Sequence, residues 1–151
     1  MTYINYYINS KYSNARAIPF DNQTLTYEAF NNKINQLARY LEKQGVKSQD
    51  HVVILADKSI ELYISIMAIL KLGALYVPVD SQYPEERIQK IIQDCKPKIV
   101  IVDKKYQKLV QSKKQCVIPF LNIEKYSNTN LNNHLDARSR SIYYIHFWFY
   151  R

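Results

Sequence analysis

The sequence contains few cysteines, with Cys95 and Cys116 as the only two among 151 residues. A secreted disulfide scaffold has a dense, even set of cysteines, and a zinc site has closely spaced pairs of ligands. Neither pattern is present here. We therefore expect two reduced, buried thiols in a cytoplasmic protein.

Glycine is just as scarce, and only Gly45 and Gly73 are present. Each follows a stretch with helical periodicity, where a residue in the left-handed conformation commonly ends a helix. Both glycines are therefore assigned to helix ends. None is left for a glycine-rich loop in which backbone N–H groups surround a phosphate.

Long apolar runs and dense basic segments are also missing. No segment approaches the apolar length of a membrane-spanning helix, and the start of the chain shows no charged leader followed by an apolar stretch. The formal charge is +8, but the lysines are spread singly and form no basic block, so no nucleic-acid partner is expected. Examples are Lys43, Lys58, Lys71, Lys90 and Lys104.

Short apolar runs that alternate with amphipathic stretches make up most of the chain. The runs at 51–56, 74–79 and 99–102 read as buried strands, and a fourth is expected at 116–121. Pro78 lacks a backbone N–H, which favours a sheet edge, a bulge or a place where strand pairing ends. Alternating strands and helices predict an α/β fold: a layered, mostly parallel sheet with helices on both faces.

Three helices are expected between and before these strands. Thr26 and Ser59 are placed to cap the first two, and Pro84 suits the first position of the third, which ends before Lys96. A short helical stretch is expected at 106–110. The residues expected to face the core are Phe30, Ile34, Leu37, Ala38 and Leu41, then Leu62, Ile66, Ile69 and Leu70, then Ile88, Ile91, Ile92 and Cys95.

Three segments match a family pattern in the same order: LTYEAFNNKINQLARYLEKQGV, LKLGALYVPVD and SQYPEERIQKIIQDCKPKIVIV. They resemble the opening of the adenylate-forming (AMP-binding) enzymes, most closely the adenylation domains of nonribosomal peptide synthetases. The resemblance extends from about Ile18 to Leu121, with Leu72 in a place where the family usually has alanine. Its motif residues are Leu25, Thr26, Tyr27 and Glu28, then Leu70, Lys71, Gly73, Tyr76, Val77, Pro78 and Asp80.

The resemblance implies an enzyme that joins a carboxylic acid to the α-phosphate of ATP with magnesium. The acyl group then passes to a thiol, usually the phosphopantetheine of a carrier protein. The family's phosphate loop, ribose-binding acid and C-terminal lysine have no counterpart in this chain. We therefore expect an incomplete N-terminal subdomain that is inactive alone, whose partners are a carrier protein and the missing remainder of the domain, and we assign no catalytic, cofactor-binding or metal residue.

Several reactive residue types have simpler structural interpretations. Tyr27, Pro78 and Asp80 are expected to be docking and turn residues, and His51 a surface or satisfied histidine. Asp94 with Cys95 is interpreted as a helix end rather than a nucleophilic site, because no histidine is near. Glu85, Glu86 and Arg87 are expected to form a solvated first turn of a helix.

The chain is divided accordingly into four parts. Residues 1–24 are an approach segment without a specified structure, 25–121 the N-terminal part of the adenylation domain, 122–136 a polar loop, and 137–151 a tail. The tail is rich in aromatic and basic residues. Read one nucleotide forward, its codons can encode the family's phosphate-loop motif, because Trp148 followed by Phe149 must then give glycine. A frame change between about Asp136 and Ser141 is the favoured interpretation.

Two alternatives stay open on the sequence. The chain can be the opening of an acyl-CoA synthetase or a D-alanine carrier-protein ligase, which share these motifs. It can instead be a non-enzymatic α/β module, whose basic, aromatic tail binds a membrane surface or a protein partner.

Overall fold

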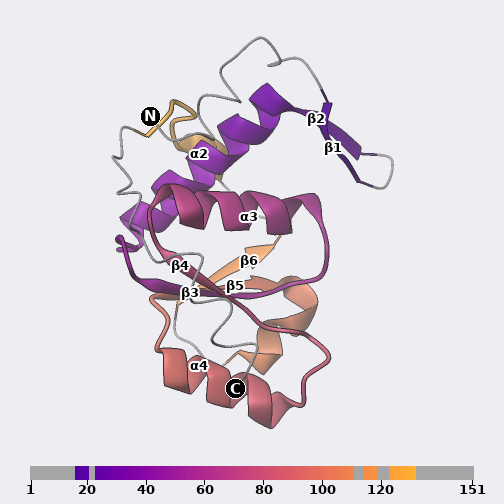
Figure 1. The fold of residues 1–151 in the computed structure, drawn as a ribbon, viewed down its shortest axis with the longest axis vertical. Coiled ribbons are helices and arrows are strands. Elements are labelled where there is room, and N and C mark those ends of the chain that lie inside the picture. The colour runs from indigo at the N-terminus through magenta and orange to yellow at the C-terminus, as the bar shows by residue number, and fades with distance from the viewer. Residues whose placement is uncertain (1–15, 21–22, 111–113, 119–122, 132–151) are drawn as a thin grey trace.

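The computed structural model describes residues 16–20, 23–110, 114–118 and 123–131 (Figure 1). Its centre is a sheet of β3 (His51–Leu55), β4 (Leu75–Pro78), β5 (Ile99–Asp103) and β6 (Gln115–Ile118). The strand order is β4-β3-β5-β6, and each neighbouring pair is parallel. The predicted parallel α/β sheet is therefore confirmed, with the proline-containing strand β4 on the outside of this sheet.

Side chains alternate along each strand, so each strand projects apolar residues from both faces of the sheet. Both faces are buried. In β3, Val52 and Ile54 belong to one hydrophobic cluster, whereas Val53 and Leu55 belong to another on the opposite face. Strand β5 keeps the same register, since Val53 lies opposite Val100. The chain thus needs helices on both sides of a single sheet.

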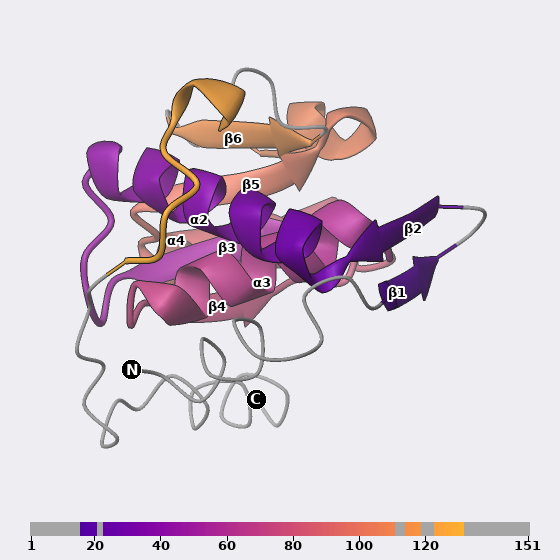
Figure 2. The same cartoon turned by 90° about the horizontal axis from the view of Figure 1, so that it is seen from above.

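The helices meet this need unequally. Helices α2 (Tyr27–Lys43) and α3 (Ile60–Lys71) share the first hydrophobic cluster and cover one face, while α4 (Glu85–Cys95) covers the other. Figure 1 shows α3 and α4 on opposite sides of the strands, and Figure 2 shows α2 and α3 side by side. In the described part of the chain, no helix combines the length and apolarity needed to span a lipid bilayer.

The helix ends follow the sequence signals. The Thr26 hydroxyl accepts a hydrogen bond from the N–H of Ala29, and the Ser59 hydroxyl accepts one from the N–H of Leu62, each at 3.1 Å. At the other end of α2, Gly45 has a φ of 93°, and its N–H donates to the carbonyl of Glu42. Gly73 has a φ of 68° and closes α3 in the same way.

Three local predictions differ from the structure. In α3 the fully buried stripe contains Ile60, Ile64 and Ala68 along with Ile69, whereas Leu62, Ile66 and Leu70 are only half-buried. This helix is apolar on most sides, so its periodicity does not fix which side faces inward. Pro84 caps α4 rather than forming its first residue, and the short helix near residue 106 is a 3-10 helix, η1 (Lys104–Leu109).

The ends of the described chain add two features, one beginning in the approach segment that the sequence left unspecified and one within the expected polar loop at 122–136. Strands β1 (Arg16–Phe20) and β2 (Gln23–Thr26) form an antiparallel hairpin before α2. After β6, residues Ile123–Leu131, here called the strap, begin with the 3-10 helix η2 (Ile123–Lys125) and pack on α2. The expected tail at 137–151 and the end of the fourth predicted strand lie outside the described residues.

Replacing Gly45 with alanine tests the role of its left-handed backbone. A Cβ atom at this position strains the φ of 93° and lies 3.2 Å from Cε of Lys98. We expect Gly45→Ala to lower the free energy of unfolding by about 1–2 kcal/mol, as measured by urea denaturation. The exposed neighbour Lys47 supplies the control Lys47→Ala, and equal denaturation midpoints for the two variants would contradict the assignment.

Candidate functional site

The carboxyl ends of the parallel strands gather one polar cluster. In open parallel sheets, ligands bind outside this edge where neighbouring strands lead to opposite faces. Strands β3 and β5 are such neighbours, since β3 continues into α3 and β5 into η1, which contacts α4. Asp57 follows β3 and accepts hydrogen bonds from Nζ of Lys105, Oη of Tyr106 at 2.9 Å and Oγ of Ser81 at 3.3 Å.

This cluster joins the segments that follow β3, β4 and β5, and we call it the carboxyl-edge latch. It is a structural contact rather than a reactive centre. The hydrogen bond from Lys105 lowers the pKa of Asp57, with Tyr106 helping, and the same bond raises the pKa of Lys105. Both charged side chains are about half exposed, so water screens their attraction and the ion pair contributes little stability. A carboxylate that accepts three hydrogen bonds and has a lowered pKa is a poor proton acceptor for a substrate.

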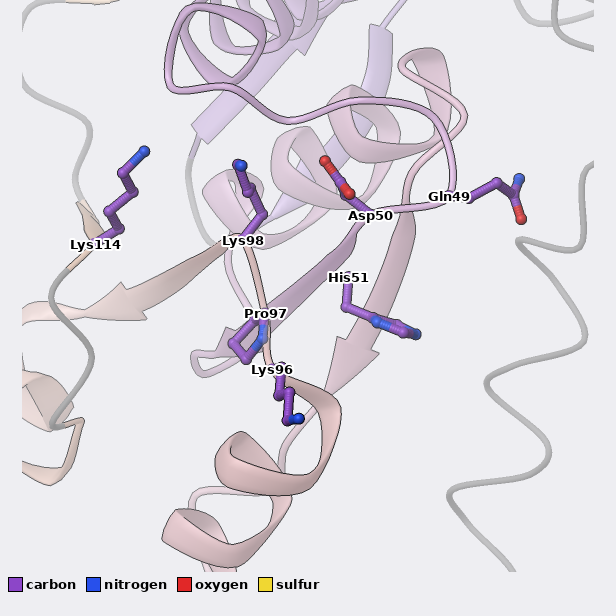
Figure 3. Close-up of a pocket in the computed structure, with 7 residues that line it drawn as sticks. All are labelled: Gln49, Asp50, His51, Lys96, Pro97, Lys98 and Lys114. Carbon is purple, nitrogen blue, oxygen red and sulfur yellow. The ribbon is translucent and has the colours of Figure 1, made fainter.

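A cavity of about 290 Å³ lies at the opposite, amino-terminal edge of the sheet (Figure 3). It is lined by Gln49, Asp50, His51, Lys96, Pro97, Lys98 and Lys114. Figure 3 shows that Lys98 and Asp50 point one way while Lys96 and His51 point in other directions. Nζ of Lys114 donates to the carbonyl of Gln44 at 2.9 Å. The cavity is basic, but its charged groups do not converge on one point as an anion site requires.

A third polar cluster is buried between helices α2 and α3. Lys71 is only 4% exposed, and its Nζ donates to Oδ1 of Asn31 at 2.8 Å and to Oδ1 of Asn35 at 2.7 Å. Both of these partners are neutral amides, and burial lowers the pKa of Lys71 to about 8. Lys71 is one of the singly spread lysines of the sequence, and the structure shows that it is buried.

The amide nitrogens of this cluster extend it to the strap. Nδ2 of Asn31 and Nδ2 of Asn35 each donate to Oδ1 of Asn130 at 3.0 Å, and Asn35 also donates to the carbonyl of Asn128 at 2.8 Å. Residues from α2, α3 and the strap therefore share one network. We call Asn31, Asn35, Lys71 and Asn130 the amide–lysine cluster.

The residues considered as candidates in the sequence belong to several different elements. Tyr27 begins α2, Pro78 ends β4, and Asp80 is exposed, with its Oδ1 accepting the N–H of Gln82 at 2.9 Å as in a turn. His51 begins β3 and lines the cavity described above. Glu85, Glu86 and Arg87 are exposed in the first turn of α4.

Neither cysteine has the character of a nucleophile. Both are free and buried, and burial raises the pKa of Cys95 to about 11 and that of Cys116 to about 12. A thiol of this kind holds almost no thiolate near neutral pH. Asp94, beside Cys95, is exposed. The expectation of buried thiols at these positions is confirmed.

The described residues do not fit the ATP and magnesium that the sequence resemblance implies. No group of three or more histidine, cysteine, aspartate or glutamate residues in this part of the chain could hold a metal ion. Both glycines are occupied in ending helices, as their positive φ values show. No reaction step can therefore be derived from these side chains.

Comparisons with known proteins point to one family. The family described as "AMP-binding enzyme" matches residues 8–143, which extends beyond the region recognised in the sequence on both sides. Tyrocidine synthase 1 of Brevibacillus parabrevis is 48% identical over 94 residues, which are 62% of this chain and 9% of that protein. The match thus covers less than a tenth of the length of this curated relative.

Solved structures show the same fold. The anthranilate CoA ligase AuaEII in complex with anthranoyl-AMP matches with a TM-score of 0.79 at 23% identity, over 88% of this chain and 28% of that one. NpsA-ThdA, an artificially fused adenylation-PCP di-domain from Klebsiella oxytoca, matches with a TM-score of 0.70 at 26% identity, over 87% and 25% of the two chains.

The buried ammonium of Lys71 predicts a pH-dependent stability. Its pKa is near 10.5 in the unfolded chain but about 8 when folded, so the unfolded state binds more protons between these values. The free energy of unfolding contributed by Lys71 therefore rises with pH across this window, by up to about 3 kcal/mol. Denaturation of the wild type and Lys71→Met between pH 7 and about 10.5 should show this rise in the difference between the two proteins.

Comparing the wild type with Lys71→Met cancels an opposing effect of the two thiols on the free energy of unfolding. The raised pKa values of Cys95 and Cys116 make the folded state lose stability above about pH 9, since the unfolded thiols ionise first. Both variants contain these thiols, so their effect cancels. The exposed Lys58 provides the control Lys58→Met, and a flat difference for Lys71→Met would show that Lys71 is not desolvated.

Proposed function

Since the chain belongs to the AMP-binding enzyme family, we propose that it supplies the N-terminal part of an adenylation domain of the nonribosomal peptide synthetase type. Such a domain activates an amino acid with ATP, releasing pyrophosphate, and passes it to a carrier-protein thiol. Alone, this chain is inactive in that reaction. Its substrate amino acid is not specified by any residue described above.

One observation carries the proposal: the likeness to a peptide synthase is strong and local. Tyrocidine synthase 1 is 48% identical over 94 residues, whereas the similarity of the anthranilate CoA ligase, at 23% identity, speaks for the fold alone. The likeness to an adenylation-PCP di-domain supports a carrier protein as partner. The buried free thiols support a reducing compartment such as the cytoplasm.

The chemistry of the described residues supports the proposed inactivity. A triphosphate needs several convergent backbone donors or cations, and the basic cavity residues point in different directions. In the carboxyl-edge latch, the Asp57 carboxylate already accepts three hydrogen bonds. ATP, magnesium and phosphopantetheine therefore belong to the assembled enzyme in this proposal, and the remainder of the domain is its first partner.

An exchange assay tests the proposal. The purified chain is incubated with ATP, magnesium, labelled pyrophosphate and a mixture of the common amino acids, with an intact peptide-synthetase adenylation domain as the positive control. We expect no amino-acid-dependent exchange above background from this chain. Exchange that depends on one amino acid would overturn the claim of inactivity and would also identify the substrate.

We also propose that residues 137–151 are translated out of frame. The support is the codon arithmetic. In the shifted frame His146 can give threonine, Phe147 can give serine and Trp148 must give glycine, so the order Thr-Ser-Gly of the family's phosphate loop is encodable. We expect the coding sequence to continue in the shifted frame through that loop. Codons at Ile145, Phe147 and Tyr150 that cannot regroup to tyrosine, serine and threonine would refute it and favour the tail-bearing interaction module.

A further inference from the structure

We propose that Lys71 is a positioning residue that fixes the strap on helix α2 through the side chains of Asn31 and Asn35. Lys71 does not touch the strap in any contact described here. It holds two amides, and these in turn hold Asn130 and the carbonyl of Asn128. Lys71 would act in this way whether or not the chain takes part in adenylate formation.

The middle of the strap is held by this network and by Tyr126, whose ring lies edge-on to that of Tyr40 with the ring centroids 5.8 Å apart. The ends of the strap are anchored by Ile123 and Leu131, which are 4% and 9% exposed and belong to the first hydrophobic cluster. Between them, residues Glu124 to Thr129 are exposed or half-buried. Gln36 and Arg39 of α2 also hold the strap, but through exposed or half-buried hydrogen bonds. The hydrogen bonds of Asn31 and Asn35 differ in that they start from residues that are only 6% and 0% exposed.

The chemistry of the ammonium explains why Lys71 sets the direction of the amides. An ammonium group donates and never accepts, so only amide oxygens can face it. With their oxygens turned to Lys71, Asn31 and Asn35 must turn their nitrogens away from it. The strap presents two acceptors there, Oδ1 of Asn130 and the carbonyl of Asn128. The lysine thereby selects a strap conformation that offers oxygen atoms.

Removing the ammonium should release this selection. In Lys71→Met, the buried oxygens of Asn31 and Asn35 lose their donor, so the ammonium no longer fixes the orientation of either amide. An amide that turns to seek a new donor for its oxygen no longer directs its N–H groups at the strap. The strap then loses its hydrogen bonds to Asn31 and Asn35 although no strap residue has changed.

Limited trypsin digestion of the full chain separates this local release from general unfolding. Lys125 lies exposed in the strap, and Lys90 lies exposed in α4 on the other face of the sheet. We expect Lys71→Met to speed cleavage after Lys125 by about tenfold, while cleavage after Lys90 changes by less than about twofold. Equal acceleration at both sites, or none at Lys125, would overturn the proposal.

Asn35→Asp provides a second test that keeps Lys71 paired. The carboxylate still accepts from Nζ of Lys71, but it has no N–H to donate to Asn128 or Asn130. We expect faster cleavage after Lys125 together with an unchanged or raised denaturation midpoint. This combination distinguishes a positioning role of Lys71 from a purely stabilising one. Unchanged cleavage at Lys125 would contradict the relay, by which we mean the link from Lys71 through the asparagines to the strap, even if Lys71→Met fails to fold.

A double-mutant cycle tests whether Lys71 and Asn130 belong to one relay. Asn130→Ala removes the acceptor in the strap, so adding Lys71→Met should speed Lys125 cleavage much less than it does in the wild type. Fully additive effects would show that Lys71 acts elsewhere. Lys58→Met is the matched control for loss of an exposed lysine.

Discussion

Burial of both faces of β3 and β5 is the constraint on which the rest of the structure depends. Four consecutive residues, Val52 to Leu55, are each at most 2% exposed, so water is excluded from either side of the strand. Parallel strands must be linked by crossovers, and these crossovers provide the covering helices. The single sheet thereby determines that α3 and α4 lie on opposite faces and that α2 completes the first one.

The layered fold was predictable because its determinants are local. Runs of β-branched residues, hydroxyl caps at Thr26 and Ser59, and a glycine after each of the first two helices all act within a few residues of themselves. The inward face of α3 was not predictable in the same way. A helix that is apolar on most sides gives no contrast, and only the position of the sheet shows that Ile60 and Ile64 point inward.

The amide–lysine cluster was missed for a different reason. Asn31 and Asn130 are 99 positions apart, and no local pattern connects them. One signal was nevertheless present: Lys71 continues the spacing of Ile60, Ile64 and Ala68, so it falls on the buried stripe of its helix. Asn31 and Asn35 are spaced by four in α2 and lie beside its apolar stripe. Polar residues at positions of apolar periodicity therefore indicate a buried polar network.

The choice of amides rather than a carboxylate around Lys71 has a physical consequence. A carboxylate would neutralise the ammonium and keep its pKa high, but it could donate no hydrogen bond onward. Two asparagines leave the charge less well compensated, which agrees with the pKa lowered to about 8. In return, each amide accepts from Lys71 through its oxygen and donates to the strap through its nitrogen. The cluster thus gives up some stability of the folded state and gains a connection between α3 and a segment of chain that follows the sheet.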